Sequence, residues 1–299
     1  MISILIPTYN YDCRTLVHAL SEQGRQLSKE LAAEAFAFEI VVADDASTDP
    51  ETERCNASMA QWTGVRYLRC KENMGRARIR NFLFSQARYD HCLFIDCDAL
   101  VCTPDFLHRY YEARNLADAV CGALRNPEVC PKGCELRYRY EQQANRHRTV
   151  AYRESRPYAY LSTFNLLLHR SLLEQLPFDE RCTEYGYEDA LMGLMMEQKG
   201  FSIAHVDIPL IHNGMDPNAV FLQKTETALR TLAKLGEPMQ SFSALSRLCR
   251  KLQRLHLHNA FLLLYRCIRP ALRKNLSGHH PQLLFFHLYK TGEYLRLIH

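Results

Sequence analysis

The stretch that decides the fold runs from His91 to Val101 and reads HCLFIDCDALV. Its apolar run Leu93-Phe94-Ile95 predicts a short buried strand, which delivers Asp96 and Asp98 to its carboxyl end. If the strand continued through them, these two carboxylates would point to the same side. Hard oxygen ligands at this spacing suit Mg²⁺ or Mn²⁺ held between a protein and a diphosphate. An Asp-rich turn after a strand has the same sequence, so the interpretation depends on the rest of the chain.

Three earlier segments repeat the pattern of an apolar strand that ends in polar residues. We expect these strands over 2–7, 38–43 and 65–68. They alternate with segments of helical spacing, at about 13–22, 27–36, 50–61 and 76–87. This alternation predicts an α/β fold with a mixed, mostly parallel sheet and helices on both faces. Loops that follow parallel strands emerge at one edge, so we expect four side chains to converge there: Tyr9, Asp45, Asn73 and Asp96.

The helix expected over 76–87 begins with three arginines, Arg76, Arg78 and Arg80. The N–H groups at a helix N-terminus already favour phosphate, and nearby guanidinium groups strengthen that preference. An arginine on a solvated helix face is equally common, so each of the three has both interpretations at this stage.

The composition describes a globular chain with an uneven charge distribution. The 299 residues are 47% hydrophobic and 23% charged, which is enough apolar material for a substantial core. Residues 241–299 contain ten Lys and Arg and one acid, Glu293, so they carry +9. Because the whole chain carries +4, residues 1–240 carry −5. A basic tail on a neutral-to-acidic body favours an anionic partner, such as a membrane surface or nucleic acid.

Two features favour a cytoplasmic location. The amino-terminal MISILIPTYN lacks the basic region and the cleavage site of a signal peptide, and no apolar run is long enough to span a bilayer. The 12 cysteines are scattered through apolar segments rather than spaced as a disulfide framework, and reduced thiols are then the default.

The number, order and spacing of the polar blocks resemble glycosyltransferase family 2, whose members have the GT-A fold. The likeness extends over about residues 1–213, and no single block is decisive. The blocks are SILIPTYN at 3–10, VVADDAS at 41–47, Asn73-Met74-Gly75 with Arg80-Asn81, FIDCD at 94–98, Asn165, Phe178-Asp179-Glu180 and YGYED at 185–189.

This resemblance implies a metal-dependent, inverting transfer of a hexose from a nucleotide-sugar, usually a UDP-sugar, to a hydroxyl of a polysaccharide or lipid-linked glycan. Asp45 would accept from the N3–H of the base, and Asp189 would be the general base with Glu188 beside it. Asp98 would bind Mn²⁺ or Mg²⁺, with Asp96 and His212 as further ligands. The implied donor-binding residues are Pro7, Thr8, Tyr9, Asp45, Asn73, Gly75, Arg80 and Asp96.

The chemistry of these roles follows from the reaction. A diphosphate leaving group gains negative charge as the glycosidic bond breaks, and a divalent ion stabilises that charge. The acceptor hydroxyl is a weak nucleophile, so a positioned carboxylate must take its proton. Structural alternatives remain, because acids at the start of a helix, here Glu188 and Asp189, also act as caps. A lone histidine such as His212 is often structural.

We expect residues 1–215 to form the GT-A domain and residues 216–299 to form a basic helical region. Between 125 and 160 many Arg and Tyr side chains suit an acceptor site, although they also suit a solvated helix face. Helices are expected at about 217–235, 242–265 and 282–298, with leucines between Arg and Lys in the second. This pattern suits either peripheral contact of 241–299 with an anionic membrane at its cytoplasmic face or packing on the parent domain.

Two other functions fit part of the sequence. A nucleotidyltransferase shares the sheet and the metal-binding carboxylates, but that class usually has a Gly-rich loop with Lys or Arg where this chain has PTYN at 7–10. A catalytically inactive fold of the same kind would serve as a membrane- or nucleic-acid-binding scaffold. The presence of Asp45, Asp96, Asp98 and Asp189 favours a working enzyme, and we expect no nucleic-acid partner.

Overall fold

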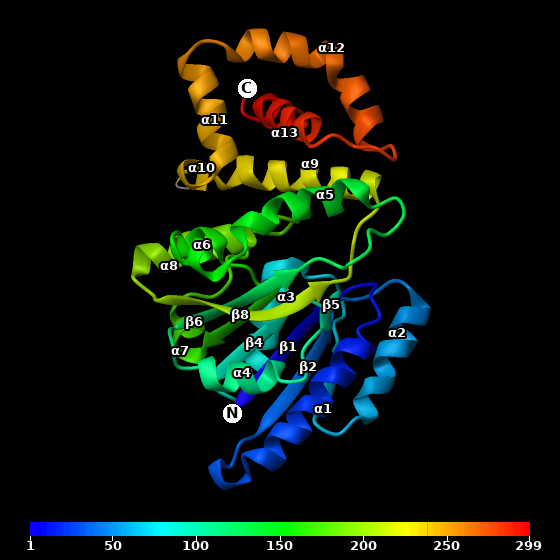
Figure 1. The fold of residues 1–299 in the computed structure, drawn as a ribbon, viewed down its shortest axis with the longest axis vertical. Coiled ribbons are helices and arrows are strands. Elements are labelled where there is room, and N and C mark those ends of the chain that lie inside the picture. Colours follow the sequence, from blue (N-terminus) through cyan, green and yellow to red (C-terminus); the bar gives the residue numbers. More distant parts are fainter. Residues whose placement is uncertain (238) are drawn as a thin grey trace.

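The computed structural model of the chain describes residues 1–237 and 239–299 and is built around one eight-stranded mixed sheet (Figure 1). The strand order is β3-β2-β1-β4-β7-β6-β8-β5. The first four of these strands are parallel, and β7 pairs antiparallel with both β4 and β6. The bounds are β1 Ile2–Thr8, β2 Phe38–Asp44, β3 Val65–Arg69, β4 His91–Ile95, β5 Ala99–Val101, β6 Ala119–Arg125, β7 Asn165–His169 and β8 Ile203–His212. The predicted α/β sheet is therefore confirmed.

Alternating side chains of the central strands build one core on each face of the sheet. In β1, Ile4 and Ile6 belong to one core and Leu5 to the other. In β4 the same division separates Leu93 from Phe94. Because successive side chains of a strand point to opposite faces, strands that are apolar throughout need a cover on both sides.

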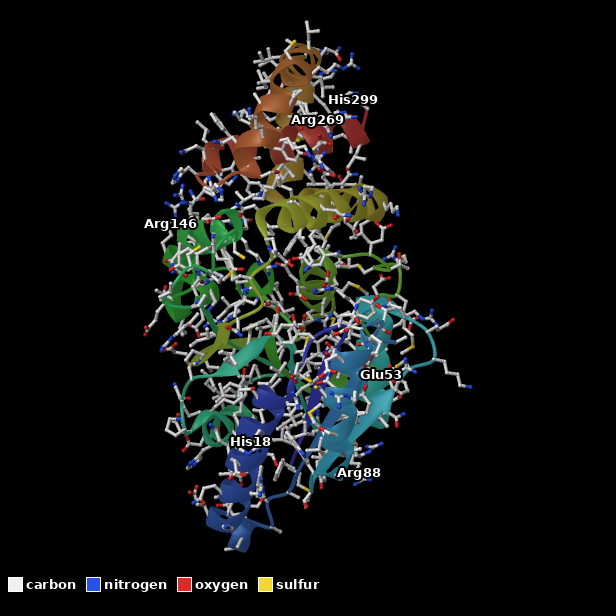
Figure 2. All side chains as sticks on the ribbon, turned by 90° about the vertical axis from the view of Figure 1, so that its right-hand side faces the viewer. His18, Glu53, Arg88, Arg146, Arg269 and His299 are labelled. Atoms are coloured by element: carbon white, nitrogen blue, oxygen red, sulfur yellow. The ribbon has the colours of Figure 1, made fainter. Side chains whose placement is uncertain are left out.

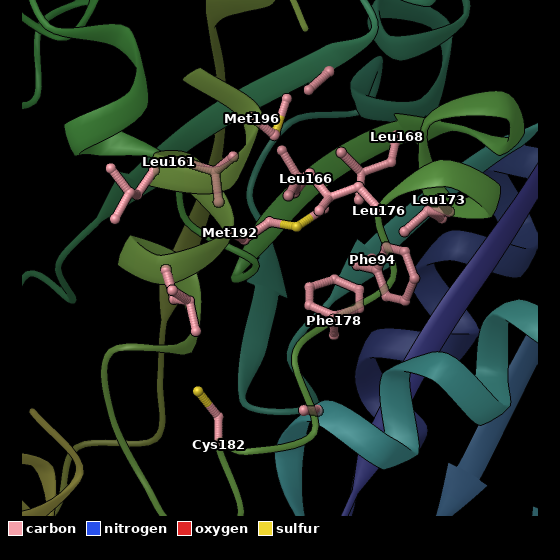
Figure 3. Packing of buried hydrophobic residues seen from close by; sticks show 14 of the residues in the cluster. Phe94, Leu161, Leu166, Leu168, Leu173, Leu176, Phe178, Cys182, Met192 and Met196 are labelled. Atoms are coloured by element: carbon pink, nitrogen blue, oxygen red, sulfur yellow. The ribbon is translucent and has the colours of Figure 1, made fainter. Parts of the chain in front are cut away.

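Helices cover both faces, as the sequence predicts. The core that contains Ile4 is closed by α1 (Arg14–Glu30) and α4 (Phe106–Ala113). The other core is closed by α3 (Gly75–Gln86), α7 (Arg170–Gln175) and α8 (Glu188–Lys199). Figure 3 shows Met192 of α8 beside Leu166 of β7, with Phe94 and Phe178 nearby. The remaining short helices before residue 213 are α2 Pro50–Ala57, α5 Glu135–Ala144, α6 Val150–Glu154 and 3₁₀ turns at Ala32–Glu34, Ser58–Gln61, Asn145–His147 and Pro157–Tyr160.

Two predicted boundaries are wrong. The two helices expected over 13–22 and 27–36 are one helix, α1, because Leu20, Gly24 and Leu27 continue a single buried face. The helix expected over 242–265 is divided by a turn at 255–257, where His256 has a φ of 55°. The strand that precedes Asp96 ends at Ile95, as predicted, and both aspartates lie in the turn to β5.

The C-terminal helices pack on the rest of the chain through a third core and also through the core that contains Leu5, which includes Leu229, Leu232 and Tyr294. They are α9 Asn218–Leu235, α10 Met239–Phe242, α11 Ala244–Arg254, α12 His258–Leu276 and α13 Leu283–Leu297. Leu136 of α5 joins Phe221 of α9, Tyr265 of α12 and Phe286 of α13 in the third core. In Figure 1, α13 lies inside a frame made by α9, α11 and α12. Packing on the parent domain, one of the two expectations for this region, is therefore observed.

The C-terminal helices form one end of an elongated molecule. Arg269 and His299 lie at the end opposite His18 and Arg88 (Figure 2). Among the described residues, no helix combines the length and the apolar character that crossing a bilayer requires.

Candidate active site

A cavity of about 580 Å³ opens at the carboxyl edge of β1, β2 and β4. The four side chains expected to converge at this edge, Tyr9, Asp45, Asn73 and Asp96, all line it. Lys224 of α9 lines it as well, so the C-terminal region contributes to its wall. The remaining lining residues come from 7–11, the first turns of α3, the β4–β5 turn and the segments 183–185 and 214–216.

Asn10 ties the loop after β1 to the loop after β2. Its Oδ1 accepts from the backbone N–H groups of Thr48 at 2.8 Å and Asp49 at 3.0 Å. Its own N–H donates to Ser47 Oγ at 2.8 Å, and its φ of 50° lies in the left-handed region that asparagine tolerates. These bonds hold the neighbouring Tyr9 with 46% of its surface exposed at the mouth of the cavity.

Asp45 joins the loop after β2 to the start of α3. Its Oδ1 accepts from Met74 N at 2.7 Å and its Oδ2 from Gly75 N at 3.0 Å, while Asn73 Nδ2 donates to the Asp45 carbonyl at 3.1 Å. A Cβ on Gly75 would lie 2.8 Å from the Thr183 carbonyl oxygen, and its φ is +77°, so the position requires glycine. Burial raises the pKa of Asp45, although the two backbone donors oppose that shift. A carboxylate accepts about four hydrogen bonds, so Asp45 retains capacity for a ligand.

Two of the three arginines of α3 line the cavity. Arg80 is 1% exposed, and its Nη2 donates to Asp96 Oδ1 at 2.8 Å. Arg76 donates to Glu188 Oε1 at 2.9 Å, and its guanidinium lies 4.6 Å from the centre of the Tyr185 ring. Although burial opposes ionisation, Arg80 and Arg76 hold the pKa of Asp96 below its ordinary value. Arg78 instead lies on the surface, 3.8 Å from Glu180, so the solvated-face interpretation holds for it alone.

The pairing of β5 with β8 brings Asp98 to His212. His212 is 3% exposed, with Nε2 3.2 Å from Asp98 Oδ2 and Nδ1 3.0 Å from Glu141 Oε1. Burial disfavours the charged imidazolium, but the two carboxylates outweigh it and raise the pKa of His212 to about 9. A Cβ on Gly214 would lie 2.3 Å from Asp98 Oδ2, so glycine makes room for this carboxylate. Arg137 donates to Glu141 Oε1 at 3.0 Å and also pairs with Asp216.

Asp98 and His212 fit a divalent ion that takes its remaining ligands from a diphosphate, and binding of the ion would displace the proton of His212 Nε2, because only a deprotonated ring nitrogen is a ligand. Such ions are commonly held by one or two protein groups together with substrate phosphates. Glu141 stands behind His212 as the carboxylate that orients a ligating imidazole. The third expected ligand, Asp96, is engaged by Arg80. Within residues 1–237 and 239–299, no three His, Cys, Asp or Glu side chains are grouped as a complete metal site, so phosphate ligands would have to complete it.

Asp189 is the second residue of α8 and does not belong to the cavity lining. Its Oδ1 accepts from the Thr163 hydroxyl at 2.7 Å and its Oδ2 from Thr163 N at 3.2 Å. Burial and then the charge of Glu188 raise the pKa of Asp189 to about 6, against the effects of Arg80 and Thr163. A carboxyl of this kind is ionised at neutral pH and still basic enough to take a proton. Glu188 Oε2 accepts from Gly186 N at 3.0 Å, so this side chain also ties the start of α8 to the turn before it.

Sequence reasoning did not identify Glu141, Thr163 or Lys224. Their partners lie far away in the chain, so no local pattern marks them. The nearest signal was the block at Asn165, which proves to be a core residue: its Oδ1 accepts from Tyr110 at 2.6 Å and its Nδ2 donates to the Ile208 carbonyl at 2.8 Å.

Residues 3–177 match the family model described as glycosyl transferase family 2, which is more than half of the chain. A curated relative, the glycosyltransferase GlyG of Streptococcus pneumoniae serotype 4, is 31% identical over 101 residues. This alignment covers 34% of the present chain and 31% of GlyG, so the chain spans about a third of that relative's length.

Two solved structures share the architecture. The mannosyltransferase PcManGT from Pyrobaculum calidifontis, in complex with GDP-Man and Mn²⁺, has a TM-score of 0.55 and 18% identity, covering 99% of this chain and 85% of that chain. The glucosyl-3-phosphoglycerate synthase from Mycobacterium tuberculosis, in complex with Mn²⁺, UDP and glucosyl-3-phosphoglycerate, has a TM-score of 0.51 and 19% identity, covering 78% of this chain and 79% of that chain. At these identities the likeness concerns the fold, and it confirms the fold expected from the sequence.

Proposed function

This chain belongs to glycosyltransferase family 2, and from that premise we propose that it moves a hexose from a nucleotide-sugar, preferably a UDP-sugar, to a hydroxyl group with inversion at the anomeric carbon. The observation that carries the proposal is the convergence of two aspartates, Asp96 and Asp98, with two arginines, Arg76 and Arg80, in one cavity at the sheet edge. A diphosphate needs such a combination of cations and metal-binding oxygens.

The donor nucleotide occupies the cavity of about 580 Å³ in this proposal. The exposed ring of Tyr9 offers a surface for the base, and Asp45 keeps acceptor capacity for its N3–H. Arg76 is partly exposed and offers its charge to the diphosphate, whereas the buried Arg80 holds Asp96 in place. The proposed donor residues are Pro7, Thr8, Tyr9, Asp45, Asn73, Gly75, Arg80 and Asp96.

Asp98 and His212 would hold Mn²⁺ or Mg²⁺, with Glu141 orienting the imidazole. When bound, the ion would act as a Lewis acid on the diphosphate oxygens. This assignment is supported by the space that Gly214 leaves for the Asp98 carboxylate. The two solved structures with Mn²⁺ give a precedent for the ion in this fold.

Asp189 would act as the general base, with Glu188 tuning its pKa. An acceptor hydroxyl that loses its proton to Asp189 attacks the anomeric carbon from the side opposite the leaving diphosphate, so one displacement inverts the configuration. A pKa of about 6 supports this role, because the group is ionised at pH 7. Thr163 would keep the carboxylate in place through two hydrogen bonds.

We propose that residues 1–215 form the transferase domain and that residues 216–299 form a basic helical region beside it. The acceptor would be a polysaccharide or a lipid-linked glycan, reached from the cytoplasmic face of a membrane. The charge of +9 on residues 241–299 supports peripheral contact with an anionic surface. Twelve free thiols, in the state that a reducing cytoplasm maintains, support the location.

Calorimetry of UDP binding tests the donor site without knowledge of the sugar or the acceptor. We expect binding in Mn²⁺, its loss with EDTA, and its loss in Asp98→Ala, because the diphosphate then lacks its metal bridge. Asp105→Ala is the matched control, since this exposed aspartate lies outside the cavity and should bind UDP like the wild type.

If UDP fails to bind, GDP, CDP and dTDP are tested in the same way. Binding of one of these would replace UDP in the proposal. Failure of all four would reject it and favour the inactive scaffold, and binding that survives in Asp98→Ala would reject the metal assignment.

A further inference from the structure

The outer face of α12 is an apolar surface, and no described part of the chain packs on it. In Figure 1, α12 forms the layer of the molecule farthest from the sheet. Four leucines at the α11–α12 turn and on α12, which we call the leucine edge, expose more than half of their surface: Leu255 (55%), Leu257 (51%), Leu263 (68%) and Leu264 (59%). Single exposed leucines are ordinary, but four within ten residues at one edge are informative.

The leucine edge continues along one side of α12. At about 100° per residue, Leu257, Ala260, Leu263, Leu264 and Cys267 fall within an arc of about 120°. All five are exposed. The opposite side of the helix is already packed, because Tyr265 and Leu272 lie in the third core. The helix is therefore apolar on two sides, whereas a helix that only covers its own domain needs one apolar side.

Positive charge surrounds the leucine edge. Residues 238–292 contain no Asp or Glu, so α11 and α12 carry no acid at all. Lys251, Arg254 and Arg266 are exposed, and within the part of the chain that the structure describes none of them pairs with a carboxylate. Other cations of these helices are engaged, since Arg250 pairs with Glu237 and Arg269 with Glu293.

An anionic lipid surface is the partner that satisfies both features. Leucines enter the boundary between headgroups and acyl chains, while Lys and Arg beside them contact the anionic headgroups. A second copy would bring the same positive charge against itself, and nucleic acid would leave the leucines exposed to water.

We propose that the leucine edge, flanked by Lys251, Arg254 and Arg266, docks this protein on the surface of an anionic bilayer. This inference rests on the membrane contact proposed above for residues 241–299 and names the surface that makes it. It does not depend on sugar transfer. Because no described helix can cross a bilayer, the docked helix lies in the interface. The third core connects α12 through α13 to α9, whose Lys224 lines the donor cavity, so docking would orient the cavity relative to the membrane.

Sedimentation of the full chain with vesicles tests the proposal. Vesicles of phosphatidylcholine alone are compared with vesicles that also contain phosphatidylglycerol. We expect binding to the anionic vesicles, and a loss of at least about tenfold in Leu263→Ser combined with Leu264→Ser, because less apolar area then enters the interface. Arg254→Glu combined with Arg266→Glu should cause a similar loss by removing the attraction to anionic headgroups.

Matched controls lie on the body of the protein. Leu116 is 63% exposed, and Leu116→Ser should bind vesicles like the wild type. Lys29→Glu combined with Lys71→Glu changes the charge by the same amount as the arginine pair and should retain binding. UDP calorimetry on every variant separates this proposal from the donor site, because the leucine variants should bind UDP normally even if docking is lost.

Three results would overturn the inference. The wild type could fail to bind anionic vesicles, or the leucine pair and Leu116→Ser could bind equally well. Alternatively, size-exclusion chromatography could show an oligomer that the leucine pair converts to a monomer while vesicle binding is absent, and the edge would then be an interface between copies of the chain.

Discussion

The carboxyl edge of the sheet and the outer side of the C-terminal helices differ in how their positively charged side chains are paired. At the cavity each cation has a carboxylate partner: Arg80 with Asp96, Arg76 with Glu188 and Lys224 with Asp216. Around the leucine edge, Lys251, Arg254 and Arg266 have none among the described residues. Paired charges hold side chains in defined places for a small ligand, whereas unpaired charges on a surface attract a large anionic partner without fixing its position.

The two regions also differ in what holds them together. The cavity depends on polar contacts between loops, such as those of Asn10 and Asp45. The C-terminal helices depend on apolar packing, with Tyr265 and Phe286 in the third core. Substitutions in the first region should therefore change function more than stability, and substitutions in the second should do the reverse.

The largest effect is expected at Asp189. Asp189→Asn should lower the transfer rate about a thousandfold, because the acceptor hydroxyl loses its base. UDP affinity, measured by calorimetry, should stay unchanged, since Asp189 lies outside the cavity lining. Asp105→Asn serves as the control. Equal transfer by Asp189→Asn and the wild type would remove Asp189 from the mechanism.

One glycine substitution in each region tests this contrast between stability and function directly. A Cβ on Gly292 of α13 would lie 2.4 Å from the Tyr265 ring, so Gly292→Ala should destabilise the protein by about 1–3 kcal/mol in urea unfolding. Below the transition it should still bind UDP. Gly214→Ala, which crowds Asp98, should weaken UDP binding in Mn²⁺ with a smaller loss of stability.

Gly278→Ala is the control for this pair, because the nearest atoms to its Cβ lie at 3.4 Å and nothing needs to move far. Its unfolding free energy should stay within about 0.5 kcal/mol of the wild type. If Gly214→Ala and Gly292→Ala had the same profile of stability and binding, the contrast between the two regions would be wrong.

The smallest effect concerns the pH dependence of transfer. The rate should rise with pH as Asp189 loses its proton, with a midpoint near 6. Glu188→Gln removes a negative charge that raises this pKa, so the midpoint should move to lower pH. Thr163→Val removes a hydroxyl donor that lowers it, so the midpoint should move to higher pH. Each shift should be under about one unit.

These two variants distinguish a change in the pKa of Asp189 from a general loss of structure, since a damaged site would lower the transfer rate without moving the midpoint of its pH dependence. Shifts in the same direction for both would contradict the proposed roles of Glu188 and Thr163.

Much of the fold and part of the site could be predicted from the sequence. Apolar runs of strand length, each ending in polar residues, were enough to expect a parallel sheet with Tyr9, Asp45, Asn73 and Asp96 at one edge. The expectation held because strand and helix periods are local properties. The end of β4 at Ile95 was also predicted, whereas α1 was mispredicted as two helices, since its continuous buried face depends on packing against the sheet.

The sequence by itself thus determined the order of the elements, the polar character of the sheet edge and the excess of positive charge after residue 241. The tertiary structure decided which side chains meet. The register that sets Ala99 opposite His212 brings His212 to Asp98, and the loop before β7 brings Thr163 to Asp189. It also decided that α12 buries one apolar side and exposes the other. Such contacts join residues far apart in the chain, so they follow from how packed elements satisfy burial and hydrogen bonding together and not from any local pattern.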